Sequence, residues 1–210
     1  MTLTQVNQLS HIEAIVELAK SKNSNSEQVF IINHISWEEY ENLLDFFGDK
    51  SGVLFKYQED KLVIMSPSRN HEIFKENIGI LIKTYFFAKQ IKFYSLGSTT
   101  FRSPKKKKGI EPDKSYCLNA LKEVPDLAIE IIITSGGIDS LQIYKDLGVQ
   151  EVWFWEKEEL KVYGLENEEY QQVKQSILFP DLDLALFTNL VNKSEPLEAV
   201  LEFRQILEEK

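Results

Sequence analysis

The sequence predicts a single mixed α/β domain. Strand-like and helix-like apolar patterns alternate along the chain, which favours this fold class. The segment 126–134 is almost continuously apolar and is interrupted only by Glu130, a pattern typical of a strand buried on both faces. No internal repeat and no linker divides the 210 residues, so we expect a single domain.

The first half of the chain carries signals for helices and for a hairpin. Ser36 and Glu39 have the spacing of a capping box, which predicts a helix that runs to about Phe47. Apolar residues alternate at 53, 55 and 57, and a polar turn precedes the next apolar run, as in a hairpin. In chain order we expect a helix at 11–19, a strand at 29–32, a helix at 36–47, hairpin strands at 53–57 and 62–65, and the longest helix at 71–89.

The second half is richer in strands. We expect the lysines at 105–108 and Gly109 to form a loop. Asp139 is expected to cap a helix that Gly148 ends. In chain order we expect strands at 93–96 and 98–102 joined at Gly97, strands at 116–118 and 126–134, a helix at 139–147, strands at 149–155, 160–165 and 170–173, short helices from Pro180, and a terminal helix at 195–207.

Composition excludes several classes of protein. The chain has 24 basic and 33 acidic residues and a net charge of −9, which argues against a protein that coats nucleic acid. Lys105 to Lys108 nevertheless form a local basic run. No apolar stretch is long enough to span a membrane, the N-terminus lacks a secretory signal, and Cys117 is the single cysteine. We therefore expect a cytoplasmic protein without disulfides or a cysteine-built zinc site.

Two acidic residues, Asp113 and Glu130, stand out because of their surroundings. Glu130 lies inside an apolar strand, where an ionised carboxylate is costly unless it is paired or binds a cation. Asp113 ends an extended Glu-Pro-Asp, seventeen positions earlier, and that gap suits two strands of one ribbon that end side by side. Two such carboxylates would bind a hard divalent cation such as Mg²⁺. The alternatives are that Glu111, Asp113 and Asp126 are solvated turn residues, and that Glu130 points outward from an edge strand or pairs with a lysine.

Other candidate residues carry weaker signals. Glu72 and Glu76 are one helical turn apart and could extend a metal site, although an exposed helix face explains them as well. The glycine-rich turn at 134–137 resembles a small anion-binding turn, but such turns are common without ligands. Trp153 and Trp155 are expected in the core of a buried strand.

Several motifs, in one order, resemble those of a known family. They are Met65-Ser66-Pro67 with His71-Glu72, the segment 95–101 (SLGSTTF), the segment 109–113 (GIEPD), the segment 125–130 (PDLAIE), the segment 133–139 (ITSGGID) and the segment 144–155 (YKDLGVQEVWFW). Together they resemble the Uma-two-like family of restriction endonucleases, within the PD-(D/E)xK nuclease superfamily, over about residues 36–165. The resemblance implies a restriction-endonuclease-like core, in which helices flank a central mixed β-sheet. On that basis we expect an N-terminal helix and arm at 1–35, the nuclease domain at 36–179 and a helical extension at 180–210.

The resemblance also implies roles for individual residues. Asp113 and Glu130 match the metal-binding carboxylates of the family, and the cofactor would be Mg²⁺ with Mn²⁺ as a substitute. The backbone carbonyl of Ile131 would be a third ligand. Glu72 falls where the superfamily often places an additional acid.

One position departs from the family pattern. Family members usually carry a lysine that helps the attacking water and stabilises the phosphate, and this chain has Ser140 there. The more common lysine position of the superfamily is Ile132. Lys145 is the nearest basic residue on the same predicted helix, about 140° around it, and is our candidate for the catalytic cation. A lysine of the 105–108 run is the other source of positive charge.

These observations support two functions of different classes. The first is a Mg²⁺-dependent DNA endonuclease that hydrolyses phosphodiester bonds, slowly because of Ser140, and acts as a homodimer as expected for enzymes that cut both strands. RNA stays open as a substrate. The second is a catalytically inactive relative that binds nucleic acid or a protein partner. A third, less specific interpretation is a scaffold that self-associates through an exposed Trp153 or Trp155.

Overall fold

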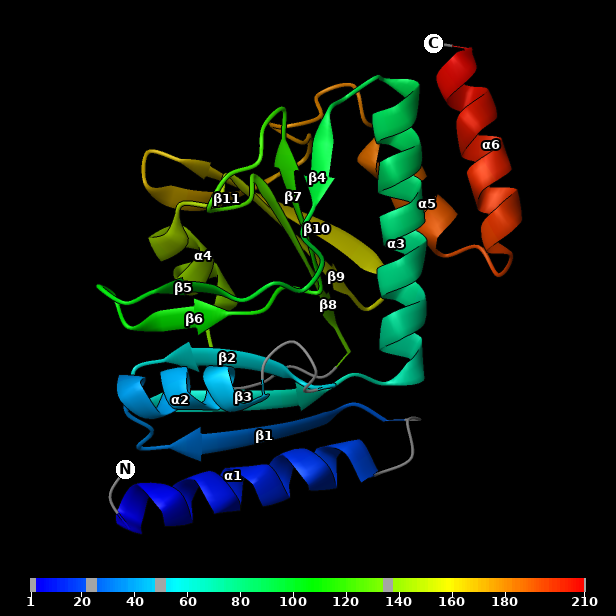
Figure 1. Ribbon diagram of the computed structural model, residues 1–210. Coiled ribbons are helices and arrows are strands. Elements are labelled where there is room, and N and C mark those ends of the chain that lie inside the picture. The colour runs from blue at the N-terminus through cyan, green and yellow to red at the C-terminus, as the bar shows by residue number, and fades with distance from the viewer. Residues whose placement is uncertain (1–2, 22–25, 48–51, 134–137, 210) are drawn as a thin grey trace. The chain divides into compact units, whose positions relative to one another are not determined.

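The computed structural model describes residues 3–21, 26–47, 52–133 and 138–209. The chain divides into two compact units, each built from several segments (Figure 1). The first unit contains residues 1–69, 99–111 and 134–147, and the second contains residues 70–98, 112–133 and 148–210. The predicted mixed α/β class is confirmed. The predicted domain limits at 35/36 and 179/180 stay predictions.

The first unit is built on a five-stranded antiparallel sheet with the order β1-β3-β2-β6-β5. Its elements are α1 (Leu3–Ser21), β1 (Gln28–Asn33), α2 (Trp37–Phe47), β2 (Leu54–Gln58), β3 (Lys61–Ser66), β5 (Phe101–Ser103), β6 (Lys108–Ile110) and α4 (Ser140–Leu147). The predicted capping box is confirmed, because the Glu39 N–H donates to Ser36 Oγ at 3.3 Å and the Ser36 N–H donates to Glu39 Oε2 at 2.7 Å. Buried side chains of α1, α2 and the sheet form the core of this unit, which includes the stacked rings of Tyr40 and Tyr57.

The end of the lysine run forms a strand, so the loop predicted there is wrong in part. Lys108, Gly109 and Ile110 form β6, which pairs with β2 and β5. A Cβ atom at Gly109 would lie 2.2 Å from the Tyr40 hydroxyl oxygen. The glycine is therefore required by close packing inside a sheet, and the lysines hide the strand because they break its apolar alternation.

The second unit is built on a six-stranded sheet with the order β11-β10-β9-β8-β7-β4, in which β8 and β9 are parallel and the other neighbours antiparallel. Its elements are α3 (Arg69–Ala88), β4 (Phe93–Ser95), β7 (Lys114–Leu118), β8 (Leu127–Ile132), β9 (Glu151–Glu156), β10 (Glu159–Glu166), β11 (Glu169–Val173), α5 (Leu184–Val191) and α6 (Pro196–Glu208). The strands predicted on either side of Gly97 are present, but β4 and β5 belong to different sheets. The strand that carries Glu130 lies inside the six-stranded sheet, as its apolar pattern predicts.

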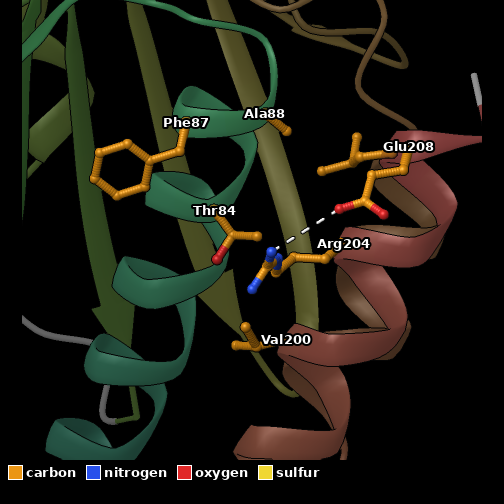
Figure 2. A pocket seen from close by; sticks show the side chains of 7 residues that line it. Thr84, Phe87, Ala88, Val200, Arg204 and Glu208 are labelled. Carbon is orange, nitrogen blue, oxygen red and sulfur yellow. Dashed lines mark ion pairs between the residues drawn. The ribbon is translucent and has the colours of Figure 1, made fainter.

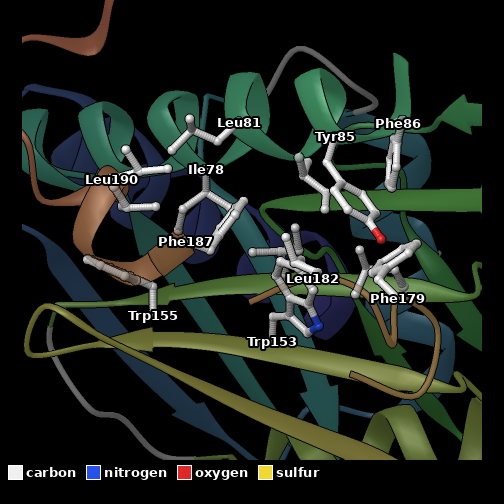
Figure 3. Close-up of a cluster of buried hydrophobic side chains, with 14 of the residues drawn as sticks. Ile78, Leu81, Tyr85, Phe86, Trp153, Trp155, Phe179, Leu182, Phe187 and Leu190 are labelled. Carbon is white, nitrogen blue, oxygen red and sulfur yellow. The ribbon is translucent and has the colours of Figure 1, made fainter. Parts of the chain in front are cut away.

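One face of the six-stranded sheet carries the core of the second unit. Ile129, Ile131 and Trp153 belong to one buried cluster with side chains of α3, α5 and α6 (Figure 3). Trp153 and Trp155 are 0% and 1% exposed, so self-association through an exposed tryptophan at these positions is excluded. Because side chains alternate along a strand, Glu130, between Ile129 and Ile131, points to the opposite face.

Candidate active site

The fold places Asp113 beside the strand that carries Glu130. Strands β7 and β8 pair in antiparallel fashion with Lys114 opposite Ile129. Asp113 directly precedes β7, and the Ile131 N–H donates a hydrogen bond to Asp113 Oδ2 at 2.7 Å, which fixes the aspartate beside β8. That the carboxylates of Asp113 and Glu130 converge on one site stays a prediction.

Both carboxylates are buried. Asp113 is 2% exposed and Glu130 is 1% exposed. Glu130 lies on an interior strand, opposite Phe154 of the parallel neighbour β9. The alternatives of a solvated turn for Asp113 and an edge strand for Glu130 are therefore excluded. A buried carboxylate requires compensation by hydrogen bonds, by a charge of opposite sign or by a cation.

The two oxygen atoms of Asp113 have different surroundings. Oδ2 accepts the Ile131 N–H and lies 3.2 Å from His71 Nε2. Oδ1 is buried and has no hydrogen-bond partner among the described residues. An unsatisfied buried oxygen of this kind costs about 1 to 3 kcal/mol, and more when it carries charge. A cation at Oδ1 would offset that cost, so Asp113 fits a ligand of a hard metal ion.

The charge of Glu111, the other acidic residue of the Glu-Pro-Asp tripeptide, is compensated by hydrogen bonds from the protein itself. Glu111 is 8% exposed, so its interpretation as a solvated turn residue is wrong. Its Oε2 accepts the Phe55 N–H at 2.8 Å, and its Oε1 accepts the hydroxyl of Thr100 at 2.7 Å. Both oxygens are occupied within the first unit, which identifies Glu111 as a structural carboxylate.

His71 is a site residue that the sequence interpretation missed. It lies in the first turn of α3, is fully buried, and contacts Asp113 through Nε2. Its Nδ1 lies 3.6 Å from Glu72 Oε1. Helical spacing could have identified His71 as buried, because it lies seven residues before Ile78 and fourteen before Tyr85, on the same face of the helix. A polar side chain on that face indicates a buried partner, and the partner is Asp113.

Glu72, which the sequence predicts as a further metal ligand, is partly exposed and paired with a lysine. It is 43% exposed at its side chain and forms an ion pair with Lys75, at 2.6 Å. The contacts with His71 and Lys75 outweigh burial and lower its pKa to about 2. Among the described residues, no group of three His, Cys, Asp or Glu side chains is arranged to hold a metal ion. The roles of Asp113, Glu130 and Glu72 as metal ligands stay predictions.

The helix predicted to carry the catalytic lysine position belongs to the first unit. Asp139 caps α4 as predicted, since its Oδ1 accepts the Gln142 N–H at 3.2 Å. Ser140 is the first residue of α4, and its Oγ accepts a hydrogen bond from Lys56 Nζ at 3.2 Å. Lys145 lies in the last turn of the same helix. Lys56 is 84 positions before Ser140 in sequence, so no local pattern could reveal that an ammonium group lies beside this position. The turn at 134–137 lies outside the described residues.

A groove elsewhere in the second unit contains none of the predicted site residues. It lies between α3 and α6, encloses about 560 Å³ and is lined by Thr84, Phe87, Val200 and Arg204 among others (Figure 2). Arg204 lies 3.9 Å from Glu208 on its rim, one turn along α6. No described helix is long and apolar enough to cross a membrane.

Comparison with known families assigns the chain to one of them. Residues 37–191 match the model of the Uma2 family, which is described as "Putative restriction endonuclease". The chain belongs to the Uma2 family. The match includes Asp113, strand β8 with Glu130, helix α3 with His71, and helix α4. The mixed α/β architecture is consistent with a restriction-endonuclease-like fold, and family membership supports a nuclease function at a coarse level. No curated protein matches the sequence.

Proposed function

We propose that this protein is a metal-dependent DNA endonuclease that hydrolyses phosphodiester bonds. The observation that carries the proposal is the buried Oδ1 of Asp113, which has no hydrogen-bond partner among the described residues and belongs to a carboxylate held beside β8, the strand of Glu130. Membership of a family of restriction endonucleases supports the same reaction class.

Asp113, Glu130 and the carbonyl oxygen of Ile131 are the ligands we assign to a divalent cation, Mg²⁺ or Mn²⁺. Mg²⁺ typically binds one or two protein carboxylates and keeps several waters, so two carboxylates are a sufficient side-chain set. When bound, such an ion supplies Lewis-acid chemistry toward water and phosphate. His71 is a positioning residue, because its contact with Asp113 Oδ2 and the Ile131 N–H together fix the orientation of the carboxylate.

The chain also needs a positive group that stabilises charge on the phosphate in the transition state. Ser140 cannot supply one, but Lys56 Nζ hydrogen-bonds to its hydroxyl. We propose Lys56 for this role and keep Lys145, on the same helix as Ser140, as the second candidate. The loss of one positioned donor typically lowers the rate about 10²- to 10³-fold, so the two lysines can be distinguished by single substitutions.

A plasmid-nicking assay with Mg²⁺ and Mn²⁺ tests the proposal. Wild type should nick, and Asp113→Asn should abolish nicking. Asp126→Asn is the matched control, because Asp126 is also a buried aspartate of the second unit that accepts a backbone N–H, from Leu118 at 2.7 Å. Retained nicking in Asp113→Asn, or equal loss in both variants, would refute the assignment. Lys56→Ala and Lys145→Ala then decide which ammonium contributes.

A second candidate function is a catalytically inactive module that binds nucleic acid or a protein partner, and Ser140 at the usual lysine position favours it. This candidate predicts that Mg²⁺ or Mn²⁺ raises the melting temperature without any product. A ligand at 100 times its dissociation constant stabilises the folded state by about 2.7 kcal/mol. Nicking by Ser140→Lys, together with no nicking by wild type, would identify a catalytically inactive relative.

The oligomeric state, the cellular location and the type of nucleic acid are further parts of the proposal. A homodimer would supply two sites for the two strands of a duplex, and light scattering of the full chain in the presence and absence of DNA tests it. A cytoplasmic location stays a prediction. RNA is tested as an alternative substrate in the same metal-dependent assay.

A further inference from the structure

The lysines of the β5–β6 hairpin form a charged surface that the proposed catalytic residues do not use. Strand β5 pairs with β6 with Ser103 opposite Lys108. The turn between them is closed by hydrogen bonds from the N–H groups of Lys106 and Lys107 to the carbonyls of Ser103 and Pro104, and Lys107 has a φ of 49°. The hairpin therefore holds four consecutive lysines in a defined turn.

Two of the four lysines attach the hairpin to helix α4. Lys106 Nζ donates to Asp146 Oδ1 at 2.9 Å and to the Asp146 carbonyl at 3.1 Å. Lys108 Nζ donates to Asp146 Oδ2. Asp146 lies in the last turn of α4, where backbone carbonyls carry partial negative charge and favour a nearby cation. These contacts hold the hairpin backbone against the helix.

The other two lysines, Lys105 and Lys107, are exposed. Within the described part of the chain, their ammonium groups form no ion pair. One aspartate thus pairs with two of the four lysines, and the hairpin keeps a net positive charge in a chain whose net charge is −9. A local positive surface on an acidic protein concentrates a polyanion at one place and repels it elsewhere.

We propose that Lys105 and Lys107 bind the phosphate backbone of nucleic acid while Lys106 and Lys108 anchor the hairpin. The inference rests on the proposed function, which it extends by naming a surface that binds the substrate. Phosphate contacts of lysine give position and affinity without sequence readout. The tip, Ser-Pro-Lys-Lys-Lys, has no tryptophan, phenylalanine or leucine to insert into a lipid surface, which favours nucleic acid over a membrane.

Salt dependence of DNA binding tests the proposal with the full chain. Binding to a fluorescent duplex is measured in EDTA between about 50 and 200 mM KCl, so that no cleavage occurs. Each phosphate contact contributes about 0.9 to the slope of log K against log salt. Lys105→Ala/Lys107→Ala should lower the magnitude of the slope by about 1.8, which is a change of about 12-fold in the affinity ratio across this salt range.

The matched control is Lys157→Ala/Lys174→Ala, which removes two exposed lysines of the second unit and changes the net charge equally. An unchanged slope in the control, with the expected fall in the hairpin variant, supports the proposal. Equal falls in both variants, no fall in either, or no binding by wild type would overturn it. Loss of binding only to anionic phospholipid vesicles would assign the hairpin to membranes and also overturn it.

The outcomes separate this inference from the endonuclease proposal. Nicking that requires Asp113, with an unchanged salt slope in the hairpin variant, would support the endonuclease proposal and refute the hairpin proposal. A fall in the salt slope of the hairpin variant, without any nicking by wild type, would support the hairpin proposal and refute the endonuclease proposal.

Discussion

Two glycine-to-alanine substitutions should have opposite effects on stability, although the same geometry motivates both. A Cβ at Gly109 would lie 2.2 Å from Tyr40 Oη, and one at Gly79 would lie 2.3 Å from Lys114 Cε. Both positions are buried. The difference lies in what the new methyl group meets.

At Gly109 the neighbour cannot move. The Tyr40 ring is fully buried and stacks on Tyr57, with centroids 4.8 Å apart and planes at 16°. Further ring atoms of Tyr40 would lie 2.6 and 2.7 Å from the new Cβ, so rotating the hydroxyl does not relieve the clash. Overpacking of a filled core costs about 1 to 3 kcal/mol. We expect Gly109→Ala to destabilise the first unit by that amount.

At Gly79 the neighbour is the end of a flexible side chain. Lys114 would have to leave its 2.9 Å ion pair with Glu76, whose side chain is 69% exposed, and such pairs contribute at most about 1 kcal/mol. Alanine within a helix is about 1 kcal/mol better than glycine. Gly79→Ala should therefore be neutral or stabilising by up to about 1 kcal/mol.

Urea unfolding measures both changes, followed by tryptophan fluorescence. Trp37 reports on the first unit, and Trp153 and Trp155 report on the second. Tyr40→Leu should suppress much of the effect of Gly109→Ala, because it removes the ring that the methyl group meets. A cost below about 0.5 kcal/mol for Gly109→Ala, or a larger loss for Gly79→Ala than for Gly109→Ala, would refute the reasoning.

Three other substitutions test the site and its supports. His71→Phe should raise the Mg²⁺ concentration needed for nicking about 10- to 100-fold, because Asp113 loses the contact that orients it. His71→Gln should restore part of the loss. An unchanged Mg²⁺ requirement would refute the positioning role of His71. Glu151→Ala should lower the free energy of unfolding by about 3 kcal/mol or more, because this buried carboxylate accepts four hydrogen bonds; urea titration with Glu151→Gln as the milder variant checks it. Burial raises the pKa of Asp146, but hydrogen bonds from two hairpin lysines and Gln142 outweigh it and hold the pKa at about 2. The stabilising effect of the Asp146 carboxylate is therefore present above the unfolded-state pKa of about 3.9 and lost as the pH falls toward about 2. The urea midpoints of wild type and Asp146→Asn should converge over that range. A constant difference between the midpoints would contradict the stabilising role of the ion pairs of Asp146 with the hairpin lysines.

The parts of the fold that the sequence predicts are those specified by local patterns. The Ser36–Glu39 capping box needs only a spacing of three residues, and the strand around Glu130 needs only an apolar run. The proximity of Asp113 to the strand of Glu130 could also be predicted, because β7 and β8 are consecutive antiparallel strands whose separation in sequence is short.

The contacts that could not be predicted join residues far apart in sequence. His71 and Asp113 come from different elements, and so do Lys56 and Ser140. Neither pair shares a period or a motif, since the register of a sheet and the docking of a helix on it decide which side chains meet. Asp126 illustrates the same limit. Interpreted as a solvated turn residue because it follows a proline, it is in fact 5% exposed, and that interpretation is wrong.

The buried carboxylates of this protein differ in how many of their oxygens accept hydrogen bonds. Asp126 accepts Lys122 Nζ at Oδ1 and the Leu118 N–H at Oδ2. Glu151 accepts the Trp153 indole N–H at Oε1 and the Ile177 N–H at Oε2, and both oxygens of Glu111 are likewise occupied.

Asp113 is as buried as these side chains, yet its Oδ1 has no hydrogen-bond partner among the described residues. A fold that satisfies both oxygens of three other buried acids could satisfy this one with a single added donor. An unsatisfied buried group that persists in a native structure calls for a physical reason. The proposed function supplies one, because a carboxylate oxygen without a protein donor is suited to bind a divalent cation.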